Sequence, residues 1–298
     1  PWGYDASFYS DVLLGMARGA KEADASMRVL PAAFASLDDS LARVNASHLQ
    51  YLDALNVHAY SWVGGPTGTM GVHPEHPMSI LHDVNAYLRF RDAAAPGLPV
   101  YLTEWGWDSA GGGEDCTAPA DRAGDTPDPL CVSEAAQALY AVRGALLLAR
   151  KGLSRLTWFF YGNTVRSSSL WDQAKAKFSR SGLSSSSEAG FQNKQSLYAL
   201  ELFVSSLGAT HFLSVLVEDA SAYVYVLGDP VSGATHVVAW RPVDGDDNTT
   251  TGVRFAAEGF EAKQAYFVGL PQFTSAALPR VESGDWVMNI SAVPTVVE

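Results

Sequence analysis

Short apolar runs alternate with helix-patterned segments through the first two-thirds of the chain, and this alternation is the feature that most restricts its fold. The runs are nearly continuous in apolar residues, as in strands buried on both faces. The segments between them carry apolar residues every three or four positions, as amphipathic helices do. Strands and helices in alternation predict a parallel sheet covered by helices, so we expect an α/β protein here.

The boundaries of these elements follow from the pattern and from the usual end signals. Asp5 or Ser7 is the expected cap of the first helix, Ser133 begins a long helix, and Gly152 ends it. The sequence predicts helices over 7–24, 79–92, 133–152 and 195–207. Helical patterning also runs through Leu41, Val44 and Leu49. Buried strands are predicted over 27–34, 52–60, 98–104 and 153–161.

The pattern changes near Gly208. Beyond it, apolar and polar or small residues alternate with period two, and Gly, Asp and Pro separate the segments, which is typical of antiparallel strands. We therefore expect two domains, an α/β domain over 1–207 and a β-sandwich-like domain over 208–298. The predicted strands of the second domain lie near 223–227, 236–240, 253–255, 265–268 and 286–290.

Charge excludes nucleic acid as a partner. The chain has 20 Lys+Arg against 32 Asp+Glu, a net charge of −12, and no basic run. Such a surface repels phosphate backbones and suits neutral substrates. No membrane span is expected, because Arg143, Arg150 and Lys151 interrupt the best apolar candidate.

Two features favour the secretory pathway and an extracellular location. Cys116 and Cys131 bracket a loop rich in Pro, Asp and Ala, where a disulfide would restrain the chain; two unrelated buried thiols are the alternative. N-glycosylation sequons stand at Asn45, Asn248 and Asn289.

Motifs for cofactors and metals are missing from the sequence. It contains no G-x-G-x-x-G after a strand, no Walker loop and no G-x-S-x-G elbow, so no cofactor is expected. His73, His76 and His82 are close in sequence, but Pro74 and Pro77 prevent the helix that would align them. We interpret the segment as a solvated loop without metal. We interpret the glycines of 111–113 as flexible chain without a specific role.

Polar and aromatic residues follow three predicted strands at their carboxyl ends, where parallel α/β proteins form their active sites. These segments are 58–60 (HAY), 103–107 (TEWGW) and 158–161 (WFFY). A carboxylate such as Glu104 at the end of a buried strand is costly unless it is paired. A salt bridge at a barrel rim is the structural explanation, and we favour a functional one.

Residues 53–60 (DALNVHAY) and 99–107 (PVYLTEWGW) resemble strands six and seven of the (β/α)8-barrel retaining glycoside hydrolases of clan A. Residues 156–161 (LTWFFY) are similar to strand eight, and 193–200 (NKQSLYAL) resemble the last barrel helix. The resemblance implies the C-terminal half of a TIM barrel, strands five to eight, followed by a β-sandwich.

The resemblance also implies roles for individual residues. It makes Glu104 the catalytic nucleophile, Tyr60 the neighbour that positions the carboxylate, and His58 a polar residue of the sugar subsite. Aromatic rings suit the apolar faces of sugars. The implied substrate-binding residues are Trp158, Trp105, Trp107 and Tyr161.

One part of the family pattern has no counterpart. A retaining enzyme needs a second carboxyl group as acid/base, and the family's Asn-Glu pair would stand just before Pro1. We expect the other acids, Asp108, Glu114, Asp115, Asp172 and Glu188, to be solvated. A processed chain or fragment is therefore expected, completed by an upstream segment or a second polypeptide.

Two hypotheses remain open. The first is a retaining glycoside hydrolase acting on β-linked glycans with its acid/base on the missing half. The second is a non-catalytic glycan-binding or structural glycoprotein built on the same module; an upstream Asn-Glu would favour the enzyme.

Overall fold

The computed structural model describes residues 5–33, 43–65, 68–114, 116, 131–153, 155–164, 179–247, 249–256, 260–269 and 274–298. The chain divides into two compact units. The first comprises Pro1–Tyr60, Ile80–Trp105 and Leu153–Phe159, and the second comprises Ser61–Ser79, Gly106–Gly152 and Phe160–Glu298. Each unit is described by itself.

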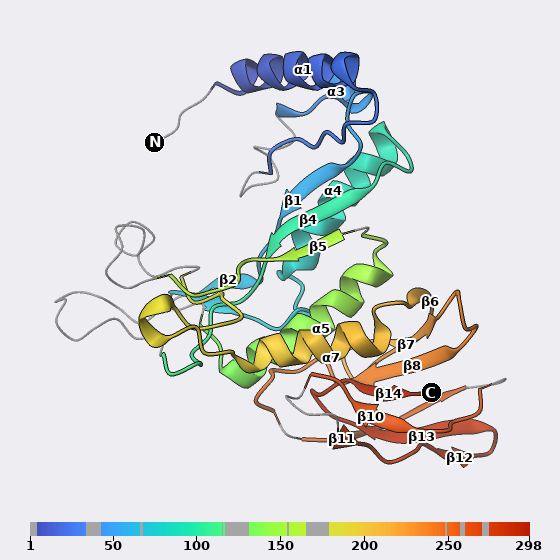
Figure 1. Cartoon of the computed structure of the whole chain (residues 1–298). Helices are drawn as coiled ribbons and strands as arrows, with labels where there is room; N and C mark the ends of the chain where they lie inside the picture. Colours follow the sequence, from blue (N-terminus) through green and yellow to red (C-terminus); the bar gives the residue numbers. More distant parts are fainter. Residues whose placement is uncertain are drawn as a thin grey trace. The chain divides into compact units, whose positions relative to one another are not determined.

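The first unit contains a parallel sheet in the order β1-β4-β5 (Figure 1). Its strands are β1 (Leu55–His58), β4 (Val100–Trp105) and β5 (Arg155–Trp158). Val57, Val100 and Leu102 are fully buried, so apolar burial of these strands forms the core of the sheet. β1 and β5 lie within two of the predicted ranges, and β4 overlaps the predicted range 98–104 and extends one residue beyond it.

The first helix begins at the Asp5 cap that the sequence predicts, and a capping box that was not predicted begins the short α3 (Ala46–Leu49). In α1 (Ala6–Ala23) the side chain of Asp5 accepts from the backbone N–H of Ser7, and in α3 Asn45 and His48 form the capping box. α4 (Ile80–Ala94) packs against β1 and β4 and buries Ile80 and Val84 completely.

The predicted strand over 27–34 is wrong for the residues that the structure describes, 27–33, which carry no strand. Val29 and Asp53 exchange backbone and side-chain hydrogen bonds, with Asp53 N–H to Val29 O at 2.9 Å and Val29 N–H to Asp53 Oδ2 at 2.7 Å. Pro31 has no N–H to extend this into a ladder. The parallel sheet therefore has three strands in the described part of the chain, where the sequence predicts four.

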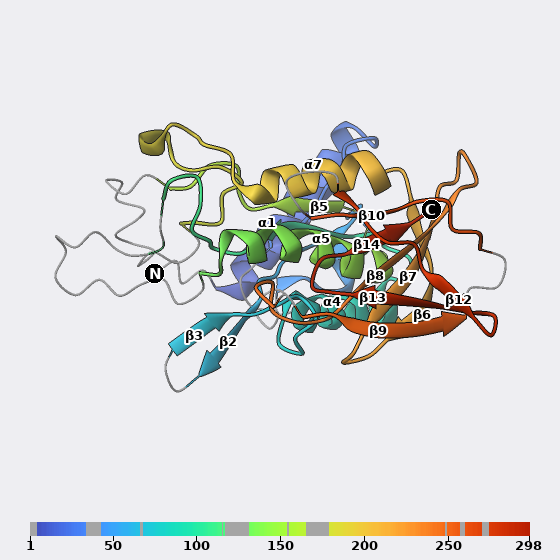
Figure 2. The same cartoon turned by 90° about the horizontal axis from the view of Figure 1, so that it is seen from below.

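Two long helices of the second unit pack against each other (Figures 1 and 2). In α5 (Glu134–Arg150) the Oγ of Ser133 accepts from Ala136 N–H at 3.0 Å, as the sequence predicts, and most of the helix is buried. α7 (Gln195–Leu207) coincides with the predicted last helix. A hairpin of β2 (Trp62–Gly65) and β3 (Gly68–Gly71) and a 3-10 turn, η1 (Ser187–Ala189), were not predicted.

The second unit also contains two antiparallel sheets. One has the order β11-β10-β14-β8-β7-β6 and the other the order β12-β13-β9. The strands are β6 (His211–Glu218), β7 (Tyr223–Gly228), β8 (Thr235–Trp240), β9 (Thr251–Ala256), β10 (Ala265–Phe267), β11 (Thr274–Ser275), β12 (Arg280–Glu282), β13 (Asp285–Ile290) and β14 (Thr295–Val297). The antiparallel prediction is confirmed; no predicted strand range covers β6 or the short strands β11, β12 and β14.

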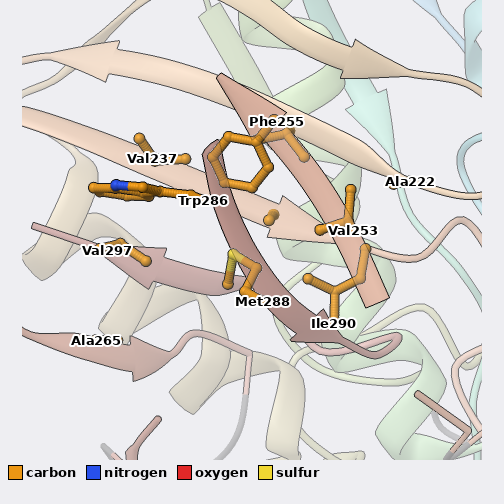
Figure 3. Packing of buried hydrophobic residues seen from close by; sticks show 11 residues of the cluster. Ala222, Val237, Val253, Phe255, Ala265, Trp286, Met288, Ile290 and Val297 are labelled. Carbon is orange, nitrogen blue, oxygen red and sulfur yellow. The ribbon is translucent and has the colours of Figure 1, made fainter. Parts of the chain in front are cut away.

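One hydrophobic core joins the two antiparallel sheets (Figure 3). Phe255, Trp286 and Met288 from the smaller sheet pack with Val237 and Val297 from the larger one. Because the cluster draws on both sheets, each sheet covers apolar side chains of the other.

Two further features bear on the expected environment of the protein. The disulfide between Cys116 and Cys131 is present, with a Cα–Cα distance of 6.2 Å, which confirms the predicted pairing. Among the residues described, no helix combines the length and apolar character needed to cross a membrane.

Candidate functional site

The carboxyl ends of the three parallel strands bring the principal candidate residues together. The register pairs His58 of β1 with Glu104 of β4, and Trp105 of β4 with Trp158 of β5. Because parallel strands end at the same edge of a sheet, residues far apart in sequence share this edge. All four belong to the first unit.

An irregularity in the pairing of β1 with β4 sets the directions of the side chains. Val57 pairs with Leu102, but the next residue, His58, pairs with Glu104, so Thr103 is an extra residue on β4. Consecutive side chains of a regular strand point to opposite faces of the sheet, and a bulge changes the direction in which the side chains point. Here Thr103 and Glu104 both reach the imidazole of His58, at its two different nitrogens.

Within the described part of the chain, the carboxylate of Glu104 has two polar neighbours. The phenol of Tyr60 donates to Oε2 at 3.0 Å, and His58 Nδ1 lies 3.2 Å from the same oxygen. The Glu104 side chain is 31% exposed, so it remains accessible. A carboxylate held by a phenol and still open to solvent can act as a nucleophile or as a proton acceptor.

His58 is the titratable neighbour of this carboxylate. Burial lowers the pKa of His58 from its ordinary value, and the negative charge of Glu104 opposes part of that shift. Its other nitrogen, Nε2, lies 3.1 Å from Thr103 Oγ1. The lowered pKa favours the neutral imidazole near neutral pH.

Aromatic rings border the site, but they differ in exposure. The rings of Trp105 and Trp158 meet edge to face with centroids 5.0 Å apart, and Tyr60 meets Phe159 at 6.3 Å. Trp158 is partly exposed, whereas Trp105 is only 2% exposed. A sugar platform needs an open ring face, so the burial of Trp105 corrects the expectation that its ring binds substrate, whereas Trp158 keeps part of its surface exposed.

Trp107 and Tyr161, the other two expected sugar-binding residues, belong to the second unit. Trp107 is 3% exposed, its Nε1–H donates to Val72 O at 2.8 Å, and its ring packs on Tyr140. This burial corrects the expectation of an open platform at Trp107. Tyr161 is 60% exposed.

Of the acids that we expected to be solvated, Asp108 is buried and Glu114 is partly buried. Asp108 is 2% exposed and accepts from the Arg180 N–H at 3.1 Å and from Ser181 Oγ–H at 2.5 Å. Glu114 accepts from Asn163 Nδ2–H at 2.8 Å and from Ser186. Neighbouring loops thus supply donors that the local sequence did not reveal. Glu188 is exposed; Asp115 and Asp172 lie outside the described residues.

The glycines of 111–113 have a specific structural role, which corrects the expectation that they are flexible chain. All three have positive φ, at 132°, 61° and 82°. A Cβ on Gly112 would lie 2.7 Å from Gln192 O. The backbone of Gln192 is therefore too close to Gly112 for any side chain at that position.

The histidine-rich segment 73–82 is also better ordered than expected. Glu75 within it is fully buried, with Nδ1 of His73 3.0 Å from its Oε2 and Arg143 paired to it. His76 Nδ1 accepts from Met78 N–H, and His82 contacts Asp83. Within the described ranges, no group of three or more His, Cys, Asp or Glu is arranged to hold a metal ion.

The structure places two of the three sequons. Asn45 and Asn289 are both exposed, the first at the start of α3 and the second on β13. Asn248 lies outside the described residues.

Sequence reasoning gave no role to Asn56 and Thr103. Thr103 Oγ1–H donates to Asn56 Oδ1 at 2.6 Å, and Asn56 Nδ2–H donates to Pro31 O at 3.1 Å. Asn56 stands two residues before His58 on the same face of β1. The two-residue spacing between Asn56 and His58 is the feature of the sequence that could have shown that Asn56 lies on the same face as the candidate site.

Solved structures of glycoside hydrolases have the same fold as this chain. A family 39 glycoside hydrolase from Bacteroides cellulosilyticus WH2 matches 97% of this chain at 18% identity, with a TM-score of 0.65. An alpha-L-arabinofuranosidase from Thermotoga maritima, in complex with arabinose, matches 99% at 12% identity, with a TM-score of 0.64. A GH51 alpha-L-arabinofuranosidase from Thermotoga petrophila RKU-1 matches 99% at 12% identity, with a TM-score of 0.58.

These comparisons confirm, at the level of the fold, the resemblance to clan A that the sequence predicts. This chain spans 54% of the family 39 structure and 62% of each arabinofuranosidase, so it matches only part of each protein. No family model and no curated protein matches the sequence.

Proposed function

We propose that this chain is the nucleophile-bearing part of a retaining glycoside hydrolase. The single observation that carries the proposal is the accessible carboxylate of Glu104 at the end of β4, held by the phenol of Tyr60 at 3.0 Å. The fold shared with glycoside hydrolases supports the same assignment.

The reaction would proceed in two steps. The Glu104 carboxylate attacks the anomeric carbon, the bond to the leaving oxygen breaks, and a carboxylic acid gives its proton to that oxygen. In the second step the same group removes a proton from water, the water attacks the anomeric carbon, and Glu104 leaves as a carboxylate. Tyr60 orients the nucleophile, and His58 lies beside it.

The acid/base group would come from a segment or polypeptide outside this chain. The sequence contains no Asn-Glu pair, which is the family's acid/base motif. In retaining enzymes the two carboxyl groups stand about 5–5.5 Å apart. The proposed architecture is the C-terminal half of a (β/α)8 barrel over 1–207 followed by a β-sandwich over 208–298.

Two surfaces support a completing half. In the described residues β1 and β5 each pair only with β4, and natural proteins cover such sheet edges. On α1, the apolar side chains of Phe8, Val12 and Met16 follow one another at four-residue spacing and are 58%, 39% and 70% exposed. A neighbouring barrel helix would bury them.

Neutral β-linked glycans are the proposed substrates, because the net charge of −12 disfavours anionic ones. Trp158 is the proposed platform beneath the sugar, and Tyr161 is a further candidate. The disulfide and the exposed Asn45 and Asn289 support a secreted, N-glycosylated protein.

The second candidate is a non-catalytic glycan-binding or structural glycoprotein, favoured by the partly exposed Trp158 and the exposed Tyr161, whose rings suit sugar faces without any catalytic group. Incubation of the full native protein with 2-deoxy-2-fluoro-β-glycosides of several sugars, followed by peptide mass spectrometry, separates the two. The enzyme gives one glycosyl adduct on the peptide with Glu104, and Glu104→Gln gives none. No adduct with any sugar, together with retained glycan binding, would establish the alternative.

A further inference from the structure

A cavity of about 550 Å³ lies between the two antiparallel sheets of the second unit, where β8 begins and β14 ends. Its lining comes from these two strands, from β13, from the turn before β8 and from the segment before β10. The volume falls within the range of about 300–1,000 Å³ that is usual for small-molecule sites. Neither Glu104 nor any proposed sugar-binding residue lines this cavity.

Part of the lining is apolar and belongs to the hydrophobic core. Val237 of β8 and Val297 of β14 are paired in the larger sheet, and Trp286 of the smaller sheet lies beside them (Figure 3). The ring of Phe260 meets that of Trp286 with centroids 6.2 Å apart. Because core packing holds these side chains, the apolar wall exists before any ligand enters.

Two polar side chains of the lining are held beside this wall. The carboxylate of Glu298 accepts from the Tyr266 hydroxyl at Oε1, at 2.6 Å, and from Gln264 Nε2–H at Oε2. Nδ1 of His236 is buried 3.3 Å from Glu298 Oε1 and has no hydrogen-bond partner among the described residues. Buried polar atoms are normally hydrogen-bonded, so this arrangement fits a site whose polar contacts a ligand completes.

The charges of the lining restrict the kind of ligand. Glu261 and Glu298 supply two carboxylates, and Lys263 supplies one ammonium group. The carboxylates disfavour an anion, and the ammonium disfavours a cation. Thr235 adds a hydroxyl. A sugar unit is neutral, its hydroxyls both donate and accept, and its C–H faces suit aromatic and aliphatic walls, so it matches every part of this lining.

We propose that this cavity binds a neutral sugar unit and is a glycan-binding site that shares no residue with the site at Glu104. The choice of sugars among neutral ligands rests on the proposed function. The place of the site does not, because it follows from the cavity and its lining.

The test is isothermal titration calorimetry of the full native protein with glucose, galactose, mannose, xylose and β-linked disaccharides of glucose. We expect at least one of these sugars to bind the wild type and also Trp158→Ala, which lacks the platform proposed near Glu104. Ala234→Phe changes an exposed residue of the lining, fills the cavity and should abolish this binding.

A second pair of variants keeps the test independent of cavity filling. Glu261→Gln, at an exposed position of the lining, should weaken binding about three- to tenfold, the effect of about one hydrogen bond. Glu201→Gln, which changes an exposed acid of α7 outside the lining, should bind like the wild type. Melting temperatures show whether each variant is folded, and Glu261→Gln decides the result if Ala234→Phe is not.

Three results would overturn the proposal: no binding of any sugar, sugar binding that Ala234→Phe and Glu261→Gln leave unchanged, and sugar binding that disappears in Trp158→Ala. Binding of tetraethylammonium in place of sugars, with loss in Ala234→Phe, would refute the assigned class of ligand. Formation of a glycosyl adduct on Glu104 is measured separately, so failure of the proposed function is distinguished from failure of this site.

Discussion

Arg143, in the middle of α5, and Glu75, in the segment after β3, form an ion pair in the interior of the second unit. Arg143 Nε lies 2.8 Å from Glu75 Oε1, and a second contact joins its Nη2 to Oε2. Both side chains are shielded from solvent, at 0% and 1% exposure. The indole Nε1–H of Trp240 on β8 also donates to Oε1, at 2.6 Å. The pair therefore joins a loop, a helix and a sheet of this unit.

Loss of the Glu75 charge should destabilise the protein strongly. In Glu75→Gln the buried guanidinium of Arg143 keeps its charge without a counterion, and breaking a buried pair on one side costs about 3–5 kcal/mol. Urea unfolding measures the change. The double variant with Arg143→Met should lose less stability than the sum of the single variants; additive losses would show that the two residues do not interact.

Glu75 should also contribute to acid unfolding. Burial by itself raises the pKa of Glu75, but the Arg143 charge and the hydrogen bonds from His73 and Arg143 outweigh it and lower the pKa to about 2. Because the pKa is lower in the folded state than the ordinary value of 4.5, the stabilisation is complete above that value and is lost as pH falls toward about 2. Stability measured between pH 6 and pH 3 should fall less steeply in Glu75→Gln.

Lys194 predicts a second pH range, in mildly alkaline solution, in which stability rises with pH. Burial lowers its pKa to about 8, although its Nζ donates to Ser109 O at 3.0 Å and to Arg180 O at 2.8 Å. Between about pH 8 and the ordinary value of 10.5 the unfolded state binds more protons, so stability rises with pH.

Thermal unfolding at pH 7.5 and 9.5 tests this expectation. The rise should disappear in Lys194→Met and persist in Lys263→Met, which removes an exposed lysine. Equal pH dependence in both variants would mean that Lys194 does not titrate in this range.

Removal of the disulfide should lower stability by about 2–4 kcal/mol, because the bond closes a loop of 15 residues of sequence separation. The matched variant replaces Cys116 and Cys131 by serine, and a reducing agent should lower the melting temperature of the wild type but not that of the variant. Equal melting temperatures without reducing agent would show that the bond contributes nothing.

Local signals in the sequence locate the elements and the edge where the candidate site lies. The caps of α1 and α5 and the residues that end β1, β4 and β5 are readable because each depends on a few neighbouring positions. Glu75 was interpreted as part of a solvated loop because its partners are distant, with Arg143 68 residues and Trp240 165 residues away. The bulge at Thr103 likewise depends on the pairing of two strands.

Tyr60→Phe should separate the two steps of the proposed reaction. The variant keeps the ring that meets Phe159 edge to face at 6.3 Å, so stability should change little. It loses the hydrogen bond to Glu104, and a bond to a charged group contributes about 1.5–3 kcal/mol. In the glycosyl-enzyme Glu104 is an uncharged ester, and the phenol stabilises the carboxylate that leaves in the second step.

We therefore expect about a tenfold to hundredfold slower deglycosylation, seen as accumulation of the adduct with a fast-reacting substrate. Equal slowing of both steps would show that Tyr60 only orients the carboxylate.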